Sequence, residues 1–153
     1  MKTKAALALS PHSPLIIDEV DLDGPGPGEV LVEIKATGIC HTDLTAMNLG
    51  LPSIQAEQLP FIPGHEGAGV VVDIGLGVTR VAIGDHVIPL YAPHCGTCSH
   101  CMRGKSNYCG VADQTAFGTV MMDGKTRFHY GGQPVYHALF CSTFSLFIFC
   151  KKN

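Results

Sequence analysis

Four cysteines in one short segment restrict the fold of this chain more than any other feature of its sequence. They are Cys95, Cys98, Cys101 and Cys109, and their spacing is CxxCxxCx7C. Sulfurs spaced in this way can turn inward around one tetrahedral Zn²⁺ ion. Four thiolates leave no position for water, so the site is structural and not catalytic. We therefore predict a zinc lobe over residues 93–110, the alternative being four free thiols in a surface loop.

Two histidines, His94 and His100, are interleaved with these cysteines. Because four sulfurs already complete a tetrahedron, we interpret both histidines as solvated loop residues. The N-terminal apolar run, residues 5–9, is too short for the core of a signal peptide. The other apolar run, residues 138–150, is too short to span a membrane. We expect a cytoplasmic protein, in whose reducing environment clustered cysteines bind metal more often than they form disulfides.

Composition limits the remaining possibilities. At 153 residues the chain has room for one domain of ordinary size, and 46% hydrophobic residues exclude a disordered chain. The formal charge is −3, with only 10 lysines and arginines. Such a chain lacks the basic surface that binding to a phosphate backbone requires. We therefore exclude nucleic acid as a partner, and with it a nucleic-acid-binding zinc ribbon.

The first ninety residues consist of β-branched runs separated by glycine and proline, which predicts a mainly β fold with short helices. Strands are expected at residues 4–9, 15–20, 30–36, 67–74 and 85–90. A short helix is expected from Thr42, as its N-cap, to about Asn48.

One glycine pattern resembles a nucleotide-binding motif without completing it. A strand ending at Ile74 is followed by Gly75 and Gly77, as in the opening of a dinucleotide fingerprint, but Arg80 stands where the third glycine belongs. Residues 83–87 then read as a turn and a strand, where a phosphate-binding helix should begin. We interpret residues 75–77 as a tight turn and expect no Rossmann domain in this chain.

A second set of metal-binding residues lies in the first half of the chain. Cys40 follows one predicted strand and His65 precedes another. A catalytic zinc commonly takes three protein ligands and one exchangeable water or substrate, and two of the three are visible here. Asp43 and Glu66 could support them, because a ligating histidine usually donates its other N–H to a carboxylate. With 24 residues between Cys40 and His65, a buried cysteine and a satisfied histidine without metal remain the alternative.

Five segments, taken in order, resemble the N-terminal part of the medium-chain, zinc-dependent alcohol dehydrogenases, notably their glutathione-dependent formaldehyde dehydrogenase (class III) branch. They are GICHTD, PGHEGAGVV, GDHVIPLYAPHCGTCSHCMRGKSNYC, MMDGKTRF and STFS. The resemblance implies that residues 1–145 form a GroES-like, partly open β-barrel catalytic domain. In that family an NAD-binding Rossmann domain follows, and small alcohols are oxidised reversibly to aldehydes or ketones. It implies no membrane partner, and a homo-oligomer for the full-length enzyme.

The resemblance also assigns roles to single residues. Cys40 and His65 match two catalytic zinc ligands, and Thr42 matches the hydroxyl that relays the alcohol proton. Asp43 and Glu66 match residues that support the ligands, and His41 matches a position near the coenzyme pyrophosphate. The four lobe cysteines match the structural zinc ligands. Zinc would lower the pKa of a bound alcohol, and NAD would accept the hydride.

The sequence departs from the family pattern at its C-terminal end. The family's third catalytic ligand is a cysteine beyond STFS, and the chain stops before it and before the coenzyme site. Residues 146–153 form a divergent tail, and we do not expect Cys141 or Cys150 to replace the missing ligand; Glu66 is the candidate if a second zinc binds. Thr45 stands where family members often carry a histidine or tyrosine that continues the proton relay.

These departures predict a truncated chain that is inactive alone and leaves strand edges uncovered. The alternative is a non-catalytic zinc-binding module.

Overall fold

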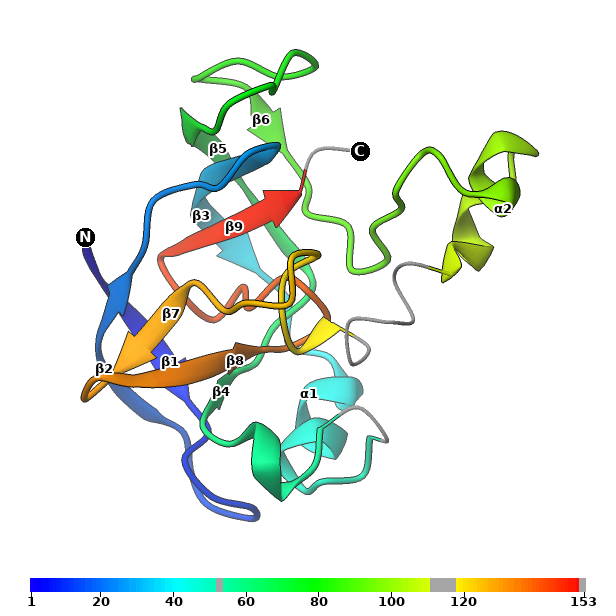
Figure 1. Cartoon of the computed structure of the whole chain (residues 1–153). Coiled ribbons are helices and arrows are strands. Elements are labelled where there is room, and N and C mark those ends of the chain that lie inside the picture. The colour runs from blue at the N-terminus through cyan, green and yellow to red at the C-terminus, as the bar shows by residue number, and fades with distance from the viewer. Residues whose placement is uncertain (52–53, 111–117, 152–153) are drawn as a thin grey trace.

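The computed structural model describes residues 1–51, 54–110 and 118–151, and two β-sheets make up most of it (Figure 1). The strands are β1 (Lys2–Leu7), β2 (Ile16–Leu22), β3 (Glu29–Thr37), β4 (Phe61–Ile62), β5 (Gly67–Ile74), β6 (His86–Val87), β7 (Phe128–Tyr130), β8 (Gln133–His137) and β9 (Phe147–Lys151). The α-helices are α1 (His41–Met47) and α2 (Ser99–Met102), and two 3₁₀ turns are η1 (Ala56–Gln58) and η2 (Ser106–Tyr108). The predicted class, mainly β with short helices, is confirmed.

The two sheets are joined along one edge into a partly open barrel. One sheet has the order β1-β2-β7-β8-β4 and the other β6-β5-β3-β9. Between them runs the segment at residues 144–146. Leu146 donates its N–H to the carbonyl of Lys4 in β1 at 3.0 Å and accepts from the N–H of Ile34 in β3 at 2.8 Å. One residue therefore connects the two sheets through the backbone.

The core lies between the sheets. Its members include Leu7 and Val20, which alternate with less buried residues along β1 and β2, and Leu31, Phe128 and Phe149. Burying each large side chain contributes about 1.5–3 kcal/mol. A second cluster places α1 against β4 through Ala46 and Phe61. Figure 1 shows α1 at one end of the five-stranded sheet, whereas the lobe that carries α2 projects away from both sheets.

Some predicted elements have the expected bounds and others do not. β5 has the predicted bounds, and residues 75–77 form the predicted turn, with Val78 donating its N–H to the Gly75 carbonyl. The strand expected at residues 85–90 is only His86–Val87, because Pro89 has no N–H for a ladder and Ile88 is 81% exposed. Helix α1 begins at His41 with Cys40, and not Thr42, as its N-cap. None of the helices described has the length and apolar character that crossing a bilayer requires.

The divergent tail contributes a strand to the four-stranded sheet. β9 pairs antiparallel with β3, and the side chains of Ile148 and Phe149 are fully buried. Residues 152–153 of this tail lie outside the described part of the chain. This C-terminal strand therefore supplies part of the core.

Candidate metal centres

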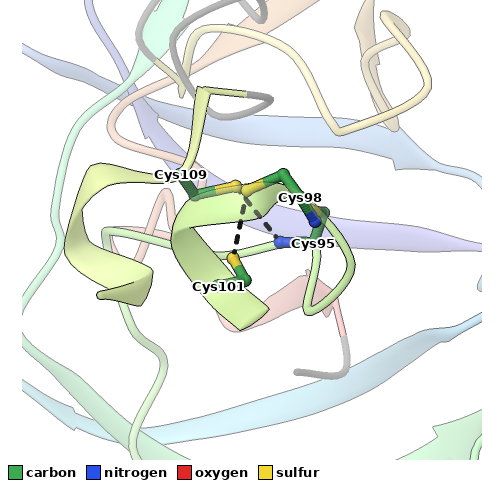
Figure 2. Close-up of side chains that lie close together, drawn as sticks. All are labelled: Cys95, Cys98, Cys101 and Cys109. Carbon is green, nitrogen blue, oxygen red and sulfur yellow. Dashed lines mark hydrogen bonds between the residues drawn. The ribbon is translucent and has the colours of Figure 1, made fainter. Parts of the chain in front are cut away.

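The lobe at residues 93–110 gathers its four cysteines from a loop and two short helices. Cys95 lies in the loop, Cys98 is the N-cap of α2, Cys101 lies within α2 and Cys109 follows η2. Figure 2 shows the four side chains close together. Their sulfur atoms all lie within 4.8 Å of one another. Positions 95–109 are therefore folded in the way that a shared tetrahedral ion requires.

The surroundings of two of these sulfurs, those of Cys95 and Cys98, favour the thiolate form that binds metal. The Thr97 N–H, the Thr97 hydroxyl and the Cys98 N–H all donate to Cys95 Sγ, and they lower the pKa of Cys95 to about 6. The N–H of Cys101 likewise lowers the pKa of Cys98. Loss of solvent raises the pKa of Cys101 to about 11. The donor set and its N–H···S bonds fit a zinc ion.

The two histidines of the lobe lie outside this cluster. His100 is exposed and its ring lies beside that of Tyr108, with 6.2 Å between the ring centres. His94 is half-buried, which corrects the expectation of a solvated side chain.

The second candidate centre joins two segments that are far apart in sequence. Cys40 caps α1 just after β3, and His65 and Glu66 immediately precede β5. The pairing of β3 with β5 places Thr37 opposite Gly67, and the Gly38 N–H donates to the Glu66 carbonyl at 2.9 Å. One ligand atom from each of Cys40, His65 and Glu66 lies within 4.8 Å of the others. The fold therefore brings together the residues that spacing alone could not connect.

Glu66 is close enough to Cys40 and His65 to be a ligand itself. Its side chain is exposed, and its carboxylate occupies the space that a Cβ atom at position 38 would need. A larger residue at position 38 would therefore displace the Glu66 carboxylate from its present place. Together the three residues offer a thiol, an imidazole and a carboxylate, all of which are donors that Zn²⁺ accepts.

Asp43 connects both segments of this centre from α1. Its Oδ2 accepts the Cys40 N–H and its Oδ1 accepts the Gly64 N–H, both at 2.9 Å. Its Oδ1 also lies 3.3 Å from Nδ1 of His65, an atom that makes no well-directed hydrogen bond within the described residues. Asp43 is 3% exposed and His65 is 9% exposed. With Nδ1 beside the carboxylate, Nε2 is the ring nitrogen that remains for a metal.

The other residues singled out in α1 have simpler surroundings. Thr42 is half-buried, and its hydroxyl oxygen accepts a hydrogen bond from the Cys40 thiol at 3.5 Å. His41 is exposed at the first position of the helix. The Thr45 hydroxyl donates to the His41 carbonyl at 3.1 Å, so it is occupied within its own helix. Sequence reasoning did not single out Tyr91, whose ring meets that of His65 edge-on with 6.1 Å between centres.

The two remaining cysteines, Cys141 and Cys150, belong to neither ligand set. Cys141 is 1% exposed, and burial raises its pKa to about 12. Burial also raises the pKa of Cys150 well above its usual value. Within the described residues, neither cysteine belongs to a group of three or more potential metal ligands.

The sequence of this chain is similar to those of known proteins. The alcohol dehydrogenase GroES-like domain family matches residues 26–142. An S-(hydroxymethyl)glutathione dehydrogenase of Escherichia coli O1:K1 is 50% identical over 145 residues, which are 95% of this chain and 38% of the relative.

Two solved structures extend the likeness to the fold. An alcohol dehydrogenase zinc-binding domain protein from Burkholderia ambifaria superposes with a TM-score of 0.89 at 35% identity, covering 100% of this chain and 40% of the other. Benzyl alcohol dehydrogenase from Acinetobacter calcoaceticus gives a TM-score of 0.84 at 29% identity, covering 99% of this chain and 39% of the other. The GroES-like fold is confirmed, and the chain spans about two fifths of the length of these relatives.

Proposed function

Because the chain belongs to the family of alcohol dehydrogenase GroES-like domains, we propose that it is the zinc-binding catalytic domain of an NAD-linked alcohol dehydrogenase. The observation that carries this proposal is the meeting of Cys40, His65 and Glu66 where β3 and β5 pair. The E. coli relative acts on S-(hydroxymethyl)glutathione by its name, which favours primary alcohols, hydroxymethyl thioethers included, as the substrate class.

Each centre has its own role in this proposal. Cys95, Cys98, Cys101 and Cys109 hold a structural zinc, and Cys40 and His65 hold a second one, with Glu66 as the third protein ligand available in this chain. A zinc ion bound there would polarise an alcohol oxygen and lower the pKa of its hydroxyl.

The neighbouring residues would bind, orient and accept protons. The carboxylate of Asp43, 3.3 Å from Nδ1 of His65, would orient the His65 ring once a metal is bound. The Thr42 hydroxyl, beside the Cys40 sulfur, is placed to take the proton of the alcohol. His41, exposed at the start of α1, would meet the coenzyme pyrophosphate.

We propose further that the chain by itself does not turn over alcohol. The only glycine pattern that resembled a dinucleotide fingerprint is the turn between β5 and β6, which is not followed by a phosphate-binding helix. NAD would then have to be bound by further polypeptide. The second candidate function, a non-catalytic zinc-binding module, is favoured by this same observation and by the complete four-cysteine cluster.

Metal counting on the full chain separates these functions. After dialysis against a weak chelator, we expect two zinc ions per chain, of which Cys40→Ser removes one and Cys98→Ser the other. Cobalt in the lobe should give tetrathiolate charge-transfer bands, and cobalt at Cys40 should not. A single zinc per wild-type chain, with no loss in Cys40→Ser, would support the non-catalytic module. Steady NADH formation from NAD and a primary alcohol would contradict the expected inactivity.

A further inference from the structure

Thr143, in the STFS segment, lies where the two segments of the second metal centre meet. Its side chain is 1% exposed, and its Oγ1 is 2.7 Å from Oγ1 of Thr37, the last residue of β3. Thr37 precedes Cys40 by three positions. A hydrogen bond between two hydroxyls therefore ties the chain after β8 to the strand end that leads into the cysteine.

The same residue contacts the segment that carries the histidine. The Thr143 N–H donates to the Gly64 carbonyl at 2.9 Å. Its side chain also fills the space beside both glycines that flank His65 and Glu66. A Cβ atom at position 64 would lie 2.5 Å from Thr143 Oγ1, and one at position 67 would lie 2.5 Å from Thr143 Cγ2. At position 67 glycine is required because Thr143 occupies this space, whereas at position 64 Phe144 and a positive φ angle require it as well.

The segment that carries Thr143 is itself held in place. Ser142 Oγ accepts the Ala138 N–H at 3.3 Å and lies 3.2 Å from Nδ1 of the fully buried His137. Leu139, Phe140 and Ser142 all have positive φ angles, which side chains rarely adopt unless surrounding contacts impose them. Thr143 is therefore mounted on a loop whose conformation the tertiary structure fixes.

We propose that Thr143 is a positioning residue for the second metal centre. Through the Thr37 hydroxyl and the Gly64 backbone it sets the separation between Cys40 on one segment and His65 and Glu66 on the other. It complements Asp43, which joins the same two segments from α1. The proposal deepens the function proposed for this centre and rests on it.

Cobalt affinity measured on the full chain, with the lobe already loaded with zinc, tests this role. Thr143→Val keeps the shape of the side chain and removes its hydroxyl, and we expect it to weaken cobalt binding at Cys40 and His65 about tenfold. Thr143→Ser, which keeps the hydroxyl, should retain the wild-type affinity. Thr37→Val should match Thr143→Val, and the double variant should be no weaker than either, because both remove the same hydrogen bond.

Thr3→Val is the matched control, because Thr3 is a buried threonine whose hydroxyl has no hydrogen-bond partner among the described residues. It should leave cobalt affinity unchanged. Cobalt binding by Thr143→Val that equals the wild type, or a loss shared by Thr3→Val, would overturn the proposal.

Amide hydrogen exchange gives a second readout that needs no second metal. In Thr143→Val we expect faster exchange at Gly38 and Gly64, whose N–H groups donate to Glu66 and Asp43, and unchanged exchange at Phe61 in the core. If the wild-type chain takes up no second cobalt ion, the proposed function of the centre fails. Exchange then decides the role of Thr143 separately, and an equal change at Phe61 and Gly38 would refute it.

Discussion

Replacing Asp43 tests how much stability one buried carboxylate supplies at the second metal centre. Asp43→Ala leaves the N–H of Gly64 buried without an acceptor, which costs about 1–3 kcal/mol. It also removes the acceptor for the Cys40 N–H at the start of α1, a partly buried group whose loss costs about 0.5–2 kcal/mol. We therefore expect the free energy of unfolding to fall by about 2–4 kcal/mol. Asp43→Asn keeps one oxygen, can satisfy only one of the two donors, and should lose about half as much.

Urea unfolding of the chain with its lobe zinc-loaded, followed by far-ultraviolet circular dichroism, measures these differences. The matched control is Asp85→Ala, because Asp85 also accepts a backbone N–H, that of Ala82 at 2.9 Å, but in an exposed turn. Water can replace that acceptor, so the control should lose less than about 1 kcal/mol. If Asp43→Ala cost no more than Asp85→Ala, the two N–H groups would not depend on this carboxylate and the reasoning would be wrong.

Three further changes probe other parts of the molecule. Cys98→Ser should release the structural zinc and expose residues 95–109 to protease, because structural zinc contributes about 10–16 kcal/mol; tight zinc and protease resistance would contradict the assignment. Arg127→Met should lower the free energy of unfolding by about 3–5 kcal/mol in the same urea assay, because it leaves the buried Glu29 carboxylate without the guanidinium that donates to both of its oxygens. Replacing both Arg127 and Glu29 by methionine should recover most of the lost stability. Burial lowers the pKa of His137 to about 3, so below pH 6.5 the unfolded chain binds a proton that the folded chain excludes. Stability should then fall by about 1.4 kcal/mol per pH unit down to that pKa, and His137→Phe should lack this component; parallel pH curves for wild type and variant would refute it.

The elements that sequence predicted well are those whose signals are local. β5 was placed with its observed bounds because glycine marks both of its ends, and the turn at residues 75–77 followed from the same punctuation. The lobe was predictable because its four cysteines lie within one short segment and can converge without help from distant chain. The sequence did not indicate how short β6 is, because the apolar residues around Pro89 favour a longer strand although the proline cannot donate a backbone hydrogen bond.

Non-local contacts account for what sequence reasoning missed. Nothing near Thr143 in the sequence indicates that its hydroxyl meets Thr37, because the two residues are joined only when the loop after β8 closes over β3. The place of β9 beside β3 was hidden for the same reason, although Phe147, Ile148 and Phe149 have strong strand propensity.

By itself, the sequence determined which chemical groups this protein has, roughly where the strands of its N-terminal half lie, and that four cysteines of one short segment can converge. The tertiary structure decided whether Cys40, His65 and Glu66 come together at all. The physical reason is that 24 intervening residues leave the separation of Cys40 and His65 open in the unfolded chain. Backbone pairing of β3 with β5, the carboxylate of Asp43 and the buried hydroxyl of Thr143 fix it in the folded one.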